Sequence, residues 1–299
     1  MGFLRKYGIY VAMVVLFAAG ALLSPAFLQS RNLINVLRQI SVNGILAIGM
    51  TFVILTEGID LSVGAMLAVS GVTMARLQML PAFFIVVIGV ITGSLGGFLN
   101  GLNVAYGRIP PFIATLAAMT SGYGVALLIS RGMPVFIDVK YTAFIGLGSG
   151  YSPILFFVIV AVIADFTLKK TGFGKFIYAL GGNEEAARLS GVAVKKIKLS
   201  AYVISGFLAA LAGVIVTARL TVGEPSAGRG YELDAIAASV IGGTSLSGGI
   251  GGVRGTVAGA LIIGLINNIF NLINLEPYYQ YIFKGLIILG ALYMEKRKK

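Results

Sequence analysis

The side chains that could do chemistry in this 299-residue chain are few, and they stand at the edges of hydrophobic runs. There is no His and no Cys, which removes the commonest general base and the usual ligands of transition metals. We therefore expect no catalytic residue, no metal site and no cofactor bound by this chain. Two acidic pairs remain as candidates for function, Glu57 with Asp60 and Glu232 with Asp234.

Phosphate-binding motifs are also missing from the sequence. A Walker A loop needs Gly-x-x-x-x-Gly-Lys followed by Ser or Thr, because its backbone amides and its Lys surround the phosphates. The segment 172–175 has the wrong spacing and continues to Phe176, and the run 242–249 contains no Lys. If ATP drives this protein, ATP and its Mg²⁺ must therefore bind to another chain.

The elements that position these residues are strongly apolar. Hydrophobic residues make up 58% of the chain and charged residues 11%, with a mean hydropathy of +0.95, whereas soluble domains carry roughly 25% charged residues. This composition predicts an all-α, polytopic integral membrane protein with one transmembrane domain over residues 1–299. The net charge of +12 is more typical of basic cytoplasmic loops than of a nucleic-acid surface.

Ten hydrophobic segments follow one another along the chain, and about 20 residues are needed to cross a bilayer. The third and the eighth segments are shorter, which predicts half-helices or tilted pieces. The segments are roughly 9–24, 39–56, 60–75, 82–105, 112–130, 152–168, 199–218, 231–243, 250–273 and 278–294.

Lys and Arg indicate the orientation. With the N-terminus inside and ten crossings, basic residues on the inside outnumber those on the outside by two to one, as the positive-inside rule requires. The inside set includes the loop 169–198 and the C-terminal residues 296–299. We therefore expect both termini in the cytoplasm.

A weak internal repeat links the two halves of the chain. Acidic residues open the third and eighth segments, at 57–60 and 232–234, and Gly-x-x-x-Gly spacing follows at 93–97 and 255–259. Two halves of inverted topology, with short helices at matching positions, are a known transporter plan. The alternative is that the glycine spacing reflects only close packing of membrane helices.

The longest polar stretch, residues 169–198, predicts a cytoplasmic loop that contains one short helix. Asn183 suits the N-cap position, and Glu184 and Glu185 follow where free amides and the helix dipole favour carboxylates. Gly191 suits the C′ position. The helix is either part of a solvated connector or an element that docks into a groove on a partner.

The acids and amides at the segment ends have two interpretations each. Asp60 caps the next helix by accepting from the N–H of Ser62 or Val63, or lines a solute pathway, and the two roles can coexist. Glu232 and Asp234 begin a helix or form a gate beside a glycine-rich loop. Amides bind hydroxyl groups or join helices, and we expect mainly the second. The pathway and gate candidates are Glu57, Asp60, Asn103, Glu232, Asp234, Asn267 and Asn268.

Three blocks stand in order along the chain: LTEGIDLSVG at 55–64, TGFGKFIYALGGNEEAARLSG at 171–191 and PSAGRGYELDAIAASVIGGTSLSGG at 225–249. Together they resemble the permease subunits of ribose-type ABC importers, in the branched-chain amino-acid/ribose permease family. The resemblance runs through almost the whole chain.

This resemblance implies a permease that moves a sugar through the bacterial inner membrane and has no ATPase activity of its own. It implies a homodimer with the pathway near its axis, two ATP-binding subunits on the cytoplasmic face and a solute-binding protein outside. A nucleoside or an amino acid remains an alternative solute. An ion-coupled secondary transporter is an alternative mechanism, which the scarcity of acids within the segments disfavours.

The resemblance also assigns the short helix of the polar loop to the ATPase, as a coupling helix. The glycine-rich run 242–252 is either a plain loop or a flexible gate or ATPase contact. The coupling-helix residues are Asn183, Glu184, Glu185, Ala186, Ala187, Arg188, Leu189, Ser190 and Gly191.

Overall fold

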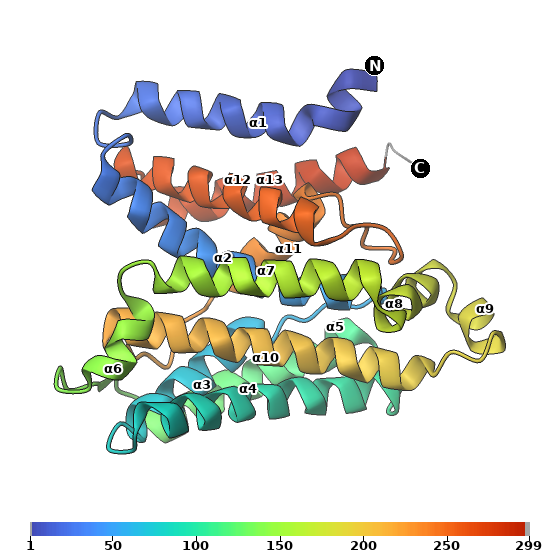
Figure 1. Cartoon of the computed structure of the whole chain (residues 1–299), viewed down its shortest axis with the longest axis horizontal. Coiled ribbons are helices and arrows are strands. Elements are labelled where there is room, and N and C mark those ends of the chain that lie inside the picture. The colour runs from blue at the N-terminus through green and yellow to red at the C-terminus, as the bar shows by residue number, and fades with distance from the viewer. Residues whose placement is uncertain (1, 297–299) are drawn as a thin grey trace.

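The computed structural model describes residues 2–296, and these form a bundle in which the long helices lie roughly parallel (Figure 1). The basic residues 297–299 of the charge count lie outside this part of the chain. The elements are α1 (Gly2–Leu23), α2 (Ser30–Leu55), α3 (Val63–Arg76), α4 (Ala82–Ala105), α5 (Pro111–Ser130), β1 (Val135–Phe136), α6 (Thr142–Ile145), the 3₁₀ turn η1 (Gly146–Gly148), α7 (Ser152–Lys170), α8 (Gly172–Gly182), α9 (Glu184–Leu189), α10 (Val194–Leu220), β2 (Val222–Gly223), α11 (Tyr231–Ile241), α12 (Val253–Leu272) and α13 (Pro277–Lys296).

Every expected hydrophobic segment coincides with a helix, although α2 and α10 begin well before residues 39 and 199. Both helices extend through polar turns that a hydrophobicity criterion leaves out. Within the described residues, six helices are long and apolar enough to cross a membrane: α2, α4, α5, α7, α10 and α12. The chain is therefore a multi-pass membrane protein. The expected short segments are short helices, α3 with 14 residues and α11 with 11.

The two ends of the bundle differ. At one end β1 pairs antiparallel with β2, with Val135 opposite Gly223, which is a small exception to the all-α prediction. We call this the β end. The other end carries α8, α9 and the loop 242–252, and we call it the α9 end. The start of α1 and the end of α13 lie toward the α9 end (Figure 1).

Helices α2 and α10 form the centre of the bundle. Residues 40–55 of α2 are buried without interruption, and α10 packs against α2, α3 and α4. Gly97 of α4 has no space for a side chain, because the carbonyl oxygen of Tyr202 in α10 fills it, and Gly93 faces Gly206 in a similar way. Small residues thus let the backbones of α4 and α10 approach closely.

The second glycine pair serves a different contact. Gly255 and Gly259 of α12 lie against the carbonyl oxygens of Gly242 and Ala238 at the end of α11. The pair in α4 packs mainly on α10, whereas the pair in α12 packs on the short helix α11. The shared spacing therefore marks close helix packing in both halves but with partners that are not equivalent.

The flank of the bundle is apolar. Large side chains such as Leu95 in α4, Leu128 in α5 and Phe166 in α7 are exposed, and few residues of these three helices are buried. An apolar surface of this extent is stable in lipid and not in water. These helices therefore face the bilayer or another membrane subunit.

Candidate translocation and coupling sites

The two short helices begin beside each other. Gly228, just before α11, packs against Gly64 in the first turn of α3, and a Cβ at Gly228 would lie 2.7 Å from the carbonyl oxygen of Gly64. From this meeting point α3 runs to the β end, where Arg76 donates to backbone carbonyls at the end of α5. Helix α11 runs to the α9 end. Two short helices that start together and run apart match the broken-helix plan of transporters.

A small polar cluster surrounds this meeting point. The guanidinium of Arg229 lies 5.2 Å from the ring centroid of Tyr123, and Oε1 of Glu232 accepts from the N–H of Gly230 at 3.2 Å. The hydroxyl of Tyr123 and Oε2 of Glu232 are buried and have no hydrogen-bond partner within the described residues. Buried polar atoms normally find partners, so this cluster has unused capacity to bind hydroxyl groups.

Asp60 lies at the centre of a second, closed cluster. Its carboxylate accepts from the N–H of Ser62 at 3.0 Å, from the hydroxyl of Ser62 at 2.6 Å and from the hydroxyl of Ser205 at 2.7 Å. The amide of Asn100 donates to Ser62 at 2.7 Å. The expected bond from Ser62 to Asp60 is thus present. Asp60 is only 1% exposed, so it joins α3, α4 and α10, and its pathway role stays a prediction.

Asp234 and Asn267 share a polar cavity of about 290 Å³ near the β end. The carboxylate of Asp234 pairs with Nζ of Lys284 at 3.0 Å and accepts from the amide of Asn267 at 3.4 Å. Helices α2, α10, α11, α12 and α13 all contribute to the walls. The polar lining residues are Gln39, Asn43, Arg219, Tyr231, Asp234, Asn267, Asn271, Gln280 and Lys284.

The remaining pathway candidates lie elsewhere. The side-chain amide of Asn268 exchanges hydrogen bonds with that of Asn32 at 2.9 and 3.2 Å, which joins α12 to α2 as expected for a helix-joining amide. Asn103 is exposed on α4, and Glu57 is exposed at the α9 end with a φ of 63°. The structure therefore places only Asp234 and Asn267 of the predicted set in one cavity.

Helix α9 has the predicted caps at both ends. Oδ1 of Asn183 accepts from the N–H of Ala186 at 2.8 Å. At the other end Gly191 has a φ of +83°, and its N–H bonds to the carbonyl of Arg188 at 3.0 Å. A left-handed glycine at C′ ends a helix without steric cost. The short helix is thus stabilised by its own sequence.

Ion pairs fix the charged face of α9. Arg188 binds Glu185 within the helix at 2.6 Å, and Lys198 of α10 binds Glu184 at 2.6 Å. The hydrogen bonds from Arg188 hold the pKa of Glu185 below its usual range. Beside this face lies a cleft of about 720 Å³ against the α4–α5 turn.

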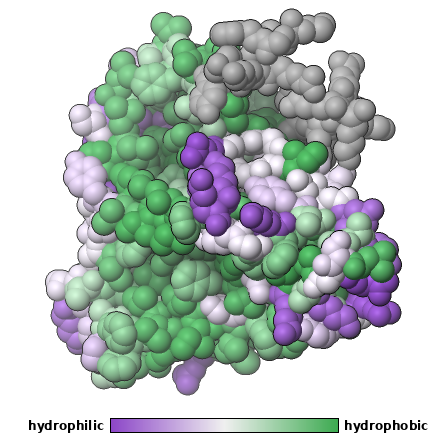
Figure 2. Space-filling view, turned by 45° about the vertical axis from the view of Figure 1, so that its right-hand side comes forward, coloured by the Kyte–Doolittle hydropathy of each residue, from purple (hydrophilic) through white to green (hydrophobic). Residues whose placement is uncertain are grey.

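An apolar side chain stands at the tip of the same helix. Leu189 is 77% exposed, whereas Ala187 is 5% exposed and packs inward. In Figure 2 the left-hand part of the surface is mostly hydrophobic, and hydrophilic side chains gather near the centre and at the right-hand side of the view. Leu189 therefore offers an uncovered apolar side chain beside the charged face of α9.

Helix α8 connects this region to the membrane helices through backbone contacts. The N–H of Gly249 donates to the carbonyl of Leu55, the last residue of α2, at 3.1 Å. Gly181 of α8 has no space for a side chain, because those same backbone atoms lie against it. The hydroxyl of Tyr178 also donates to the carbonyl of Gly251 at 2.9 Å. The end of α2, the end of α8 and the run 242–252 therefore form one backbone junction.

The comparisons with known proteins agree with this arrangement. The profile of a family described as branched-chain amino acid transport system, permease component, matches residues 32–292. The chain belongs to this permease family.

Individual members are similar over nearly their full length. A ribose import permease of Haemophilus influenzae is 47% identical over 97% of this chain and 92% of that protein. A ribose import permease of Bacillus subtilis is 44% identical over 99% and 94% of the two chains. An L-arabinose transport system permease of Escherichia coli is 40% identical over 98% and 91%. No solved structure matches the permease. The resemblance of the three sequence blocks to ribose-type permeases is thus confirmed.

Several residues of the permease sites carried little or no signal in the sequence. Lys284 is a cation inside an apolar segment, which marks it as a residue that needs a partner, but the sequence does not say which one. Ser205 lies among many small residues of α10. Tyr123 belongs to a distant segment, α5, and only the fold brings it to Arg229 and Glu232.

Proposed function

We propose that this permease is the membrane-spanning subunit of an ATP-driven importer of a monosaccharide. Helix α9 is the coupling helix, and a separate ATP-binding subunit supplies ATP hydrolysis. A solute-binding protein delivers the sugar on the opposite side. The curated relatives are named for ribose and L-arabinose, and one that is 36% identical is named for xylose, which favours a pentose.

Helix α9 is the observation that carries this proposal. It is well capped, and it exposes Leu189 where no part of the described chain covers it. Its attachment through α8 to the backbone junction gives a motion of α9 a direct route to α2 and α11. A short helix with an uncovered apolar tip suits docking into a second protein.

We propose ten crossings with both termini in the cytoplasm. The start of α1 and the end of α13 lie toward the same end as α9 (Figure 1), and the two-to-one bias of basic residues places that end inside. An even number of crossings agrees with this placement. The β end would then face the solute-binding protein.

A second copy of the permease would complete the pathway. The cluster of Tyr123, Arg229 and Glu232 would meet its counterpart near the dimer axis, and its unused hydrogen-bonding groups suit the hydroxyls of a sugar. An ion-coupled secondary transporter is less well supported, because Asp60 is held by neutral groups in a closed cluster and Asp234, which lines a cavity, is already paired with Lys284.

The test is uptake by proteoliposomes that contain the permease, its ATP-binding subunit and its solute-binding protein. We expect uptake of labelled ribose, arabinose or xylose to require ATP inside the vesicle and to survive collapse of the ion gradients. Uptake that stops when an ionophore is added, with ATP still present, would refute the importer assignment. Competition among the three pentoses then identifies the solute.

A further inference from the structure

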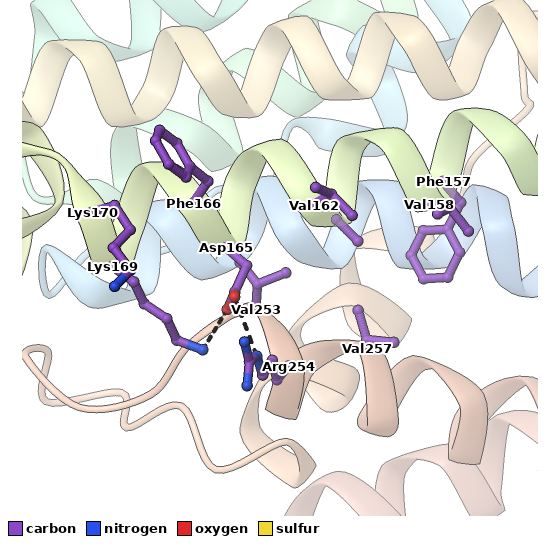
Figure 3. A pocket seen from close by; sticks show the side chains of 11 residues that line it. Phe157, Val158, Val162, Asp165, Phe166, Lys169, Lys170, Val253, Arg254 and Val257 are labelled. Carbon is purple, nitrogen blue, oxygen red and sulfur yellow. Dashed lines mark hydrogen bonds and ion pairs between the residues drawn. The ribbon is translucent and has the colours of Figure 1, made fainter.

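An open groove runs between α7 and α12 on the flank of the permease. Its volume is about 570 Å³. Valine and phenylalanine side chains line most of its length, and Figure 3 shows Val158 and Val162 of α7 facing Val257 of α12. Val158 is 50% exposed and Val162 is 64% exposed, so no part of the described chain covers this wall.

Charged side chains gather at one end of the groove, toward the α9 end. Asp165 accepts ion pairs from Lys169 at 2.7 Å and from Arg254 of α12 at 3.2 Å, and the dashed lines in Figure 3 mark both. Lys170 also lines this end. Two cations thus pair with one carboxylate and a third lines the same end, so the end of the groove keeps an excess of positive charge.

The length of the groove matches one leaflet of a bilayer. Phe157 and Lys169 are twelve residues apart on α7, and at 1.5 Å per residue this spans about 18 Å. Half of the hydrocarbon core is roughly 15 Å thick. An acyl chain lying along the valines would therefore place its phosphate beside Lys169, Lys170 and Arg254.

We propose that this groove binds an anionic phospholipid. The acyl chain packs on the apolar walls, and the phosphate binds the cationic end. Charge complementarity selects this occupant, because basic pockets between membrane helices suit anionic headgroups, whereas a zwitterionic lipid gains little from the excess positive charge. The proposal needs only that the chain lies in a bilayer and does not depend on the transported solute.

The position of the groove gives the lipid a role in coupling. Helix α7 leads directly into α8 through the capping residue Thr171, and α12 follows the loop 242–252. The lipid phosphate would hold Lys170 and Arg254 together across these two elements. Helix α8 and the loop 242–252 both belong to the backbone junction, so the lipid would stabilise one arrangement of the junction.

Native mass spectrometry of the full-length permease from nanodiscs tests the proposal. The probes are phosphatidylglycerol and phosphatidylcholine with identical acyl chains. We expect preferential retention of phosphatidylglycerol, and Lys170→Gln and Arg254→Gln should each weaken that retention about fivefold. Asp165→Asn should strengthen retention, because it removes the competing carboxylate. Lys196→Gln, at an exposed lysine away from the groove, is the matched control and should have no effect.

Three outcomes would overturn the proposal. Equal retention of the two lipids would mean an unselective lipid shell. An equal loss in the Lys196→Gln control would mean a general charge effect. Self-crosslinking of Val162→Cys in native membranes would mean that a second copy covers the groove. Arg254→Lys preserves the charge and should keep the preference for phosphatidylglycerol, and Lys170→Gln carries the test of charge removal if Arg254→Gln fails to fold. None of these readouts involves solute or ATP, so they are distinct from the uptake test.

Discussion

Removal of Lys284 should destabilise the permease far more than removal of an exposed lysine with the same kind of partner. Lys284 lies 3.0 Å from Asp234, whose side chain is 4% exposed. Lys284→Gln removes the cation that pairs with this buried carboxylate and leaves the amide of Asn267 as its remaining side-chain donor within the described residues, and an unpaired buried charge costs about 3–5 kcal/mol. Lys140→Gln is the matched control, because Lys140 and Asp138 are 3.1 Å apart but 66% and 48% exposed, and an exposed pair contributes about 0–1 kcal/mol.

The double variant Asp234→Asn with Lys284→Gln separates the ion pair from the shape of the cavity. Replacing both partners removes the unpaired charge, and such replacements are often nearly neutral. We expect the double variant to lie within about 1 kcal/mol of the wild type, so Lys284→Gln alone should cost at least about 2 kcal/mol more than the double variant.

Thermal unfolding of the purified permease in detergent measures these differences. At roughly 3 °C per kcal/mol, Lys284→Gln should lower the midpoint by about 9–15 °C and Lys140→Gln by about 3 °C or less. Strictly additive effects of the two single changes would refute the ion-pair argument. A Lys140→Gln loss as large as that of Lys284→Gln would refute the argument from burial.

Three further changes test separate contacts. Gly97→Leu should prevent the close packing of α4 on α10 and abolish stable expression. Gly285→Leu is the control and should express normally, because a Cβ at that position meets no neighbour. Equal expression of the two variants in a membrane fraction would contradict the packing argument. Leu189→Ala should leave the unfolding midpoint unchanged, because Leu189 is exposed. It should weaken binding of the ATP-binding subunit by about 1–2 kcal/mol, or roughly 5- to 30-fold. Unchanged co-purification of that subunit would count against docking at Leu189. Asp60→Asn should fold and Asp60→Ala should lose about 1–3 kcal/mol, because Ala leaves the hydroxyl of Ser205 without its acceptor; identical midpoints would show that this bond contributes nothing.

The positions of the helices were predictable from the sequence because lipid imposes a strong rule. A helix in the bilayer must be apolar and about 20 residues long, and both conditions are visible without a fold. The caps of α9 were predictable for a different reason: Asn183 and Gly191 act on their own helix, so local sequence is sufficient. Helix α9 therefore has the bounds predicted for it, whereas α2 and α10 begin before the residues predicted for their hydrophobic segments.

Contacts between distant segments were not predictable in the same way. The sequence predicted a helix start or a gate at Asp234 but not its ion pair, because Lys284 is 50 residues away and many arrangements of α11 and α13 satisfy the hydrophobic pattern. Ser205 illustrates the same limit, since its role depends on the depth at which α10 crosses the break between α2 and α3. Asn268 joins α12 to α2, which is the use that we expected mainly for such amides, and its pathway role stays a prediction.

The backbone junction determines how rigidly α8, the end of α2 and the loop after α11 are coupled to one another. Side chains between two elements act as soft spacers, because rotamer changes absorb a displacement. At Gly181 no such spacer exists, and the backbones of α2, α8 and the loop after α11 touch directly. We therefore expect a displacement of α8 to move the end of α2 with it. The glycines leave no flexible side chain between these backbones. A larger residue at Gly181 would therefore push the backbones apart and change the position of α8 relative to the end of α2.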